Sequence, residues 1–147
     1  MTILIDADGC PVVDITIAVA QQYGVPCTLL CDTAHEFARP GAETITVSKG
    51  ADSVDFALVN RVHSGDIVVT QDYGLAAMVL ARRARPIRQD GLLYTDDNIG
   101  ALLLQRHTAR KIRQSGGRLR GSTKRTAQED EDFRRALEAL IQAQKPQ

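Results

Sequence analysis

Aromatic residues are scarce in this chain of 147 residues, at 4% of the total, and tryptophan is absent. Proteins that bind single-stranded nucleic acid with little sequence preference commonly stack the bases on aromatic side chains. A stacking platform of that kind is therefore not expected here. A nucleic acid ligand would have to be held by other contacts.

Long apolar runs are also missing. No stretch approaches the roughly 18 apolar residues of a membrane-spanning helix, and residues 1–6 lack the positive charge that opens a signal peptide. We therefore expect a cytoplasmic protein that does not associate with membranes. The three cysteines, Cys10, Cys27 and Cys31, are an odd number, which argues against a disulfide framework and favours buried, apolar roles.

Acidic residues are absent from positions 98–128, although the net charge of the whole chain is zero. Lysine and arginine are frequent in the same stretch, and such a cluster can neutralise the phosphates of a nucleic acid. The candidate nucleic-acid-binding residues are Arg110, Arg118, Arg120, Lys124 and Arg125. The alternative is a solvated helix end and loop, since basic residues also suit the C-terminal end of a helix.

Strands and helices are expected to alternate along the chain, which has 44% apolar residues. Short aliphatic and β-branched runs predict strands at 2–5, 25–31, 44–47 and 67–70. Apolar residues at helical spacing predict helices at 11–22, 51–62, 75–81 and about 127–143. The alternation predicts an α/β fold in one domain over residues 1–147. Its mostly parallel sheet of about five strands, with 67–70 in the centre, is expected to carry helices on both faces.

The stretch that follows these strands is less regular. Residues 86–87 and 92–94 could form one short strand or two. Thr95 is expected to cap a helix that runs to about residue 114, with two aspartates in its first turn. Residues 115–127 are basic and contain glycine, and we expect them to form a flexible segment.

Aspartates follow several of the predicted strands. Asp6 and Asp8 come after the first strand, Asp72 comes after the fourth, and Asp52 and Asp55 begin the helix after the third. The carboxyl ends of parallel strands share one edge of the sheet, where ligands usually bind. Carboxylates that gather there repel one another unless a cation or protonation neutralises them. Oxygen ligands without clustered histidine or cysteine favour Mg²⁺ or Mn²⁺, and the number of acids permits two ions without requiring them.

Each of these aspartates also has a purely structural interpretation. Asp6 and Asp8 could be turn or cap residues, as in many loops between a strand and a helix. Asp52 and Asp55 could stabilise the first turn of their helix through its dipole, and Asp72 could cap the next helix. Such roles do not require an acid at every strand end together, so the joint pattern favours a metal site.

Four segments together resemble the YaiI/YqxD family of small bacterial proteins, and the resemblance extends over nearly the whole chain. They are residues 5–12 (IDADGCPV), 49–55 (KGADSVD), 69–76 (VTQDYGLA) and 94–99 (YTDDNI). That family is similar in turn to the PIN-like nuclease superfamily, whose members are metal-dependent ribonucleases with a three-layer, Rossmann-like fold. The resemblance implies that Asp6 and Asp72 are catalytic and metal-binding. It implies that Asp52 or Asp55 is the middle ligand, and that Asp8 is an additional ligand or a group that orients water.

Three functions compete at this point. The first is a Mg²⁺- or Mn²⁺-dependent nuclease, in which the cation activates water for attack on a phosphodiester and RNA is the favoured substrate. The second is a phosphatase of the haloacid-dehalogenase type, with Asp6 as nucleophile and Asp8 as general acid. The third is a non-catalytic module that binds RNA or a nucleotide. The oligomeric state is open, with a homodimer among the options.

Overall fold

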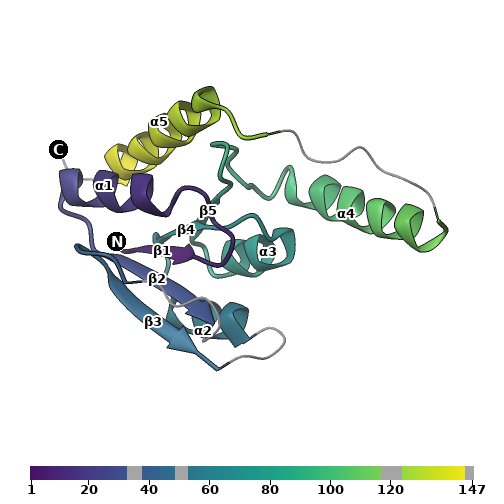
Figure 1. The fold of residues 1–147 in the computed structure, drawn as a ribbon, viewed down its shortest axis with the longest axis horizontal. Coiled ribbons are helices and arrows are strands. Elements are labelled where there is room, and N and C mark those ends of the chain that lie inside the picture. The colour runs from purple at the N-terminus through teal and green to yellow at the C-terminus, as the bar shows by residue number, and fades with distance from the viewer. Residues whose placement is uncertain (33–37, 49–52, 117–123, 145–147) are drawn as a thin grey trace.

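One parallel sheet forms the centre of the molecule (Figure 1). The computed structural model describes residues 1–32, 38–48, 53–116 and 124–144. Its strands are β1 (Ile3–Asp6), β2 (Cys27–Asp32), β3 (Glu43–Val47), β4 (Ile67–Val69) and β5 (Arg85–Ile87), in the order β3-β2-β1-β4-β5. Its helices are α1 (Val13–Tyr23), α2 (Ser53–Arg61), α3 (Tyr73–Ala81), α4 (Ile99–Gln114) and α5 (Ala127–Gln144). The predicted α/β class, with a five-stranded parallel sheet and flanking helices, is confirmed.

The central strand is β1, because it pairs in parallel with β2 on one side and with β4 on the other. The sequence analysis placed the strand near residue 67 in the centre, which is wrong. β4 lies one position nearer the edge and pairs with β1 and β5. Both strands are almost wholly apolar, as is expected of parallel strands covered on both faces.

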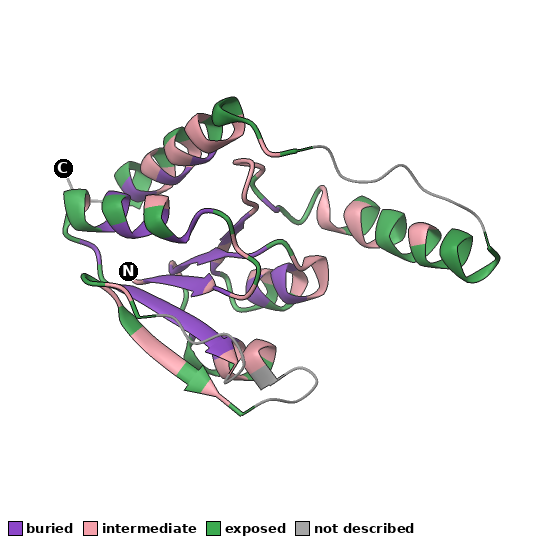
Figure 2. Cartoon of the chain, in the orientation of Figure 1, coloured by how far each residue is buried: buried purple, intermediate pink, exposed green. Residues whose placement is uncertain are grey.

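Alternate residues of the strands bury against opposite helical layers. Ile3 and Ile5 belong to the apolar cluster that contains the buried residues of α1 and α5, whereas Leu4 belongs to the cluster that contains those of α2 and α3. Figure 2 shows the buried strands between these layers. The molecule therefore has three layers, and the loops at the carboxyl ends of the strands emerge between them.

Helix α4 contacts α3 and projects beyond the three layers (Figure 1). None of its residues is buried. The sequence analysis expected this helix to begin right after Thr95, which is wrong, because it begins at Ile99. Thr95 and Asn98 instead close a turn, in which the Thr95 amide donates to the Asn98 side chain and the Asn98 amide donates to Thr95 Oγ1.

Of the two candidate strands near residues 86–94, only β5 (Arg85–Ile87) joins the sheet. Leu93 forms an isolated antiparallel bridge with Ile87. Within the described ranges, no helix has the length and apolar character needed to cross a membrane. All three cysteines are free thiols, in agreement with the expectation that the chain has no disulfide framework.

Candidate active site

The centre of the site is the gap between the carboxyl ends of β1 and β4. β1 leads to α1 on one face of the sheet and β4 leads to α3 on the other, so the two connections diverge. In open α/β sheets ligands bind at such a switch point. Asp6 is the last residue of β1, and Thr70 to Asp72 follow β4 directly. The topology therefore brings together two aspartates that lie far apart in the sequence.

Thr70 connects these two aspartates through its hydroxyl group. Thr70 Oγ1 donates to Asp6 Oδ2 at 2.9 Å and accepts from the Asp72 backbone amide at 3.0 Å. The Thr70 side chain is buried, which holds this bridge in one position. The sequence analysis did not single out Thr70 as a site residue, although a hydroxyl two residues before an aspartate was a usable signal.

Asp72 is the N-cap of α3. Its Oδ1 accepts from the backbone amides of Gly74 at 2.9 Å and Leu75 at 3.2 Å, which satisfies two otherwise free donors of the first turn. The same oxygen accepts from Arg106 Nη1 at 3.3 Å. Within the described part of the chain, neither Asp72 Oδ2 nor Asp6 Oδ1 has a hydrogen-bond partner. These two oxygens are available to a ligand.

The carboxyl group of Asp6 is hard to ionise. Burial is the largest cause and raises its pKa from 3.8 to about 6, against the opposing effect of the Thr70 hydrogen bond. The value of about 6 already includes smaller upward contributions to the pKa from the negative charges of Asp55, Asp72 and Asp8, in that order. All three acids thus act on Asp6 electrostatically, and a bound cation would relieve this repulsion.

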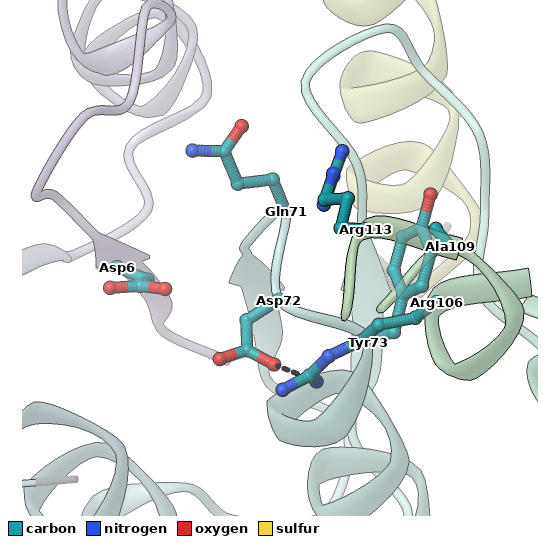
Figure 3. A pocket seen from close by; sticks show the side chains of 7 residues that line it. All are labelled: Asp6, Gln71, Asp72, Tyr73, Arg106, Ala109 and Arg113. Carbon is teal, nitrogen blue, oxygen red and sulfur yellow. Dashed lines mark hydrogen bonds and ion pairs between the residues drawn. The ribbon is translucent and has the colours of Figure 1, made fainter. Parts of the chain in front are cut away.

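A hollow of about 520 Å³ opens over Asp6 and Asp72. Figure 3 shows the two carboxylates on one side of the hollow, with Arg106 of α4 reaching Asp72 and the side chain of Arg113 turned away from both acids. Its lining residues are Asp6, Gln71, Asp72, Tyr73, Arg106, Ala109 and Arg113. A second hollow of about 290 Å³ contains Asp55 and shares Asp72 and Arg106 with the first. The site thus has an acidic wall at the sheet edge and a basic wall on α4.

Among the other predicted metal ligands, neither Asp8 nor Asp55 lines the main hollow. Asp55 lines only the second hollow, and Asp8 Oδ2 accepts from the backbone amide of Asp32 at 3.1 Å, which connects it to the end of β2. Asp52 lies outside the described residues. In the described ranges, no three histidine, cysteine, aspartate or glutamate side chains form a group that could hold a metal ion. The described site therefore has two carboxylates in the main hollow and a third, that of Asp55, in the adjoining hollow.

The predicted nucleic-acid-binding residues are found in different surroundings. Arg110 is exposed on α4, and Lys124 is exposed just before α5. Arg125 is engaged within the protein, because its side chain donates to Asp130 and to the Gln89 carbonyl, both at 2.6 Å. Arg118 and Arg120 lie outside the described residues.

Arg106 and Arg113 line the main hollow, although the sequence analysis did not choose them as binding residues. They are seven positions apart, which places them on one face of a helix. That spacing was visible in the sequence. What it could not reveal was which face of α4 turns towards the acids.

Comparison with known proteins identifies relatives over nearly the full chain. A family model described as "Uncharacterized BCR, YaiI/YqxD family" matches residues 4–143. A protein of Exiguobacterium sibiricum named UPF0178 protein is 55% identical over 141 residues, which cover 96% of each chain. A relative from Ruminiclostridium cellulolyticum is 50% identical over 96% of this chain and 92% of its own. No solved structure matches the chain significantly.

Proposed function

The chain belongs to the YaiI/YqxD family, and from its acidic sheet edge we propose that it is a divalent-metal-dependent nuclease of the PIN-like kind. The reaction is hydrolysis of a phosphodiester, with RNA as the favoured substrate. One observation carries this proposal. Asp6 and Asp72 line one hollow at the switch point of the sheet, and each offers a carboxylate oxygen that no described residue occupies.

The donor set suits Mg²⁺ or Mn²⁺. Both available donors are carboxylate oxygens, which hard cations prefer. Mg²⁺ commonly binds through one or two carboxylates, keeps several waters and completes its shell with substrate phosphates. A pair of aspartates without a complete cage is consistent with that mode of binding. Asp55 from the adjoining hollow, Asp52 or Asp8 would add further negative charge.

The residues of the chain have distinct tasks in this proposal. Asp6 and Asp72 hold the cation, which when bound supplies activation of water and neutralisation of phosphate charge. The Thr70 hydroxyl orients the Asp6 carboxylate, and the cap of α3 orients Asp72. Preorganised ligands of this kind lower the cost of binding, because the side chains are already ordered.

Calorimetric titration with Mn²⁺ tests the metal site. We expect one saturable site in the parent protein and its loss in Asp6→Asn and Asp72→Asn. Glu43→Gln is the matched control, because Glu43 is an exposed acid at the first residue of β3 and so lies at the opposite sheet edge. If the parent has no saturable site, or if Glu43→Gln loses binding equally, the proposed metal site is wrong.

Cleavage of a labelled single-stranded RNA in Mn²⁺ tests the activity. We expect the parent and Glu43→Gln to cleave the RNA and both aspartate variants to lose cleavage while still binding it. RNA binding without any cleavage by the parent would instead support the non-catalytic module. Trapping of beryllofluoride on Asp6 would support the phosphatase, in which Asp6 is the nucleophile.

A further inference from the structure

One face of α4 turns towards the acidic pair. Arg106, Ala109 and Arg113 of this helix line the same hollow as Asp6 and Asp72 (Figure 3). The rise of an α-helix separates residues 106 and 113 by about 10 Å along its axis. The two arginines therefore extend from points about two helical turns apart on the helix, with Ala109 between them. Such a row suits an elongated anion better than a compact one.

We propose that Arg106 and Arg113 bind successive phosphates of a nucleic acid strand that lies between α4 and the Asp6–Asp72 pair, and that Arg106 exchanges its partner from Asp72 to phosphate when a cation binds. This inference rests on the proposed function. It adds a face of α4 that binds the substrate, and it makes Arg106 a positioning residue. Neither follows from the metal site alone.

The charges around α4 support binding of an anion. The helix contains no acidic residue, so neither arginine has a carboxylate partner on its own helix. In the described part of the chain, Arg113 forms no ion pair, and Arg106 pairs only with Asp72. Arginine binds phosphate through planar, charge-assisted hydrogen bonds. Among the residues that the structure describes, the hollow therefore presents one guanidinium group without an ion pair, that of Arg113, and a second, that of Arg106, in a single exposed pair.

The ion pair between Arg106 and Asp72 links the acidic and basic sides of the hollow. Its two side chains are 45% and 36% exposed, and an ion pair so open to water is weak. A divalent cation at Asp72 would compete with the guanidinium group for the same carboxylate. Arg106 would then be released towards a phosphate, which the cation itself attracts to the site.

Fluorescence anisotropy in Mn²⁺ with a labelled single-stranded phosphorothioate RNA, which keeps its negative charges but resists hydrolysis, tests phosphate binding by Arg106 and Arg113 under the conditions that release Arg106 from Asp72. We expect Arg106→Ala and Arg113→Ala each to raise the Kd about fivefold. Each should also reduce the slope of log K against log salt concentration by about 0.7. Arg82→Ala is the matched control, since Arg82 is exposed at the C-terminal end of α3, away from the hollow.

Mn²⁺ titration without RNA tests the exchange of partners. Arg106→Ala leaves Asp72 without a competing cation, so we expect Mn²⁺ to bind about twofold to fivefold more tightly than to the parent. Arg106→Lys should restore much of the parental Mn²⁺ affinity. A larger gain in Mn²⁺ affinity in Arg106→Ala than in Arg113→Ala is the mark of this exchange, because both arginines line the hollow but only Arg106 pairs with Asp72.

The outcomes separate this inference from the proposed function. If both arginine variants bind RNA with the Kd and salt slope of Arg82→Ala, the proposed binding of phosphates by Arg106 and Arg113 is wrong, whether or not the protein binds Mn²⁺. Inorganic phosphate that binds as tightly as RNA would also overturn it, because a strand should engage both arginines. If Arg106→Ala leaves Mn²⁺ affinity unchanged or weaker, the exchange is wrong. If the parent protein has no saturable Mn²⁺ site, the metal site of the proposed function is wrong instead.

Discussion

At the scale of single residues, two aspartates combine a structural task with a place in the main hollow. Asp72 caps α3 through one oxygen and leaves the other available. Asp6 is held by Thr70 while burial raises its pKa to about 6. Perturbed acids in a hollow are typical of functional sites. Substitutions can separate the structural contribution of each residue from its charge.

Asp6→Asn should stabilise the metal-free protein at neutral pH. The folded-state pKa of about 6 lies above the ordinary 3.8, so the parent loses stability as pH rises from about 4 through 6. This difference sets an upper bound of about 3 kcal/mol, and the partial exposure of Asp6 reduces the expected gain to about 1–2 kcal/mol. Urea denaturation in EDTA should show this gain at pH 7.5 but not at pH 4. An equal gain at both pH values would contradict a charge effect.

Asp72→Asn and Asp72→Ala should differ in stability but have the same effect on Mn²⁺ binding. Asparagine is as good an N-cap as aspartate, whereas alanine leaves the first-turn amides of α3 unsatisfied at a cost of about 1 kcal/mol. Both variants remove the negative charge, so both should lose Mn²⁺ binding. Thermal unfolding and calorimetry measure the two effects. Equal stability of the two variants would show that the cap contributes little.

At the scale of elements, α4 and α5 serve opposite purposes although both are long. α5 buries Phe133, Leu137 and Ile141 against α1 and the sheet, which makes it part of the core. α4 buries no residue and presents arginines to the hollow. Elements with few buried contacts have low local stability. Such an element can adjust to a ligand without disturbing the fold.

A matched pair of leucine substitutions tests this contrast. Leu137 on α5 is fully buried, whereas Leu104 on α4 is 63% exposed. Leu137→Ala should lower the free energy of unfolding by about 2–5 kcal/mol, because it removes buried methyl groups and leaves a cavity. Leu104→Ala should change it by less than about 0.5 kcal/mol. Denaturant unfolding of both variants measures the difference. A large loss for Leu104→Ala would mean that α4 is packed in solution.

At the scale of the whole molecule, cation binding at the site and the stability of the fold depend on each other. Asp6 and Asp72 reach the site from β1 and α3, which belong to different layers. A cation held by both residues would bind only the folded protein, since the unfolded chain does not bring them together. Binding that is specific to the folded state raises its stability by mass action.

Mn²⁺ should therefore raise the melting temperature of the parent. At about 100 times its Kd, the ion would add about 2.7 kcal/mol, which corresponds to roughly 6–10 °C for a domain of this size. Differential scanning calorimetry should show the shift in the parent and in Glu43→Gln but not in Asp6→Asn. A shift of similar size in Asp6→Asn would place the ion elsewhere.

The sequence by itself determined the elements and their order, because each arises from local patterns. Apolar β-branched runs predicted four strands close to their observed bounds, and helical spacing predicted the buried face of α5. Strand alternation with helices also predicted a parallel sheet, whose carboxyl edge had to carry Asp6 and Asp72. The reason is that the pleat of a strand, the period of a helix and the length of a connection all depend on residues that are close together in the sequence.

Only the tertiary structure decided how these elements face one another. It placed β1 at the centre of the sheet, brought Arg106 and Arg113 to the hollow that contains the acids and engaged Arg125 with Asp130. Strand order and helix orientation depend on contacts between residues far apart in the chain. A local pattern can predict that a helix has a basic face, but packing across the whole fold selects what that face meets.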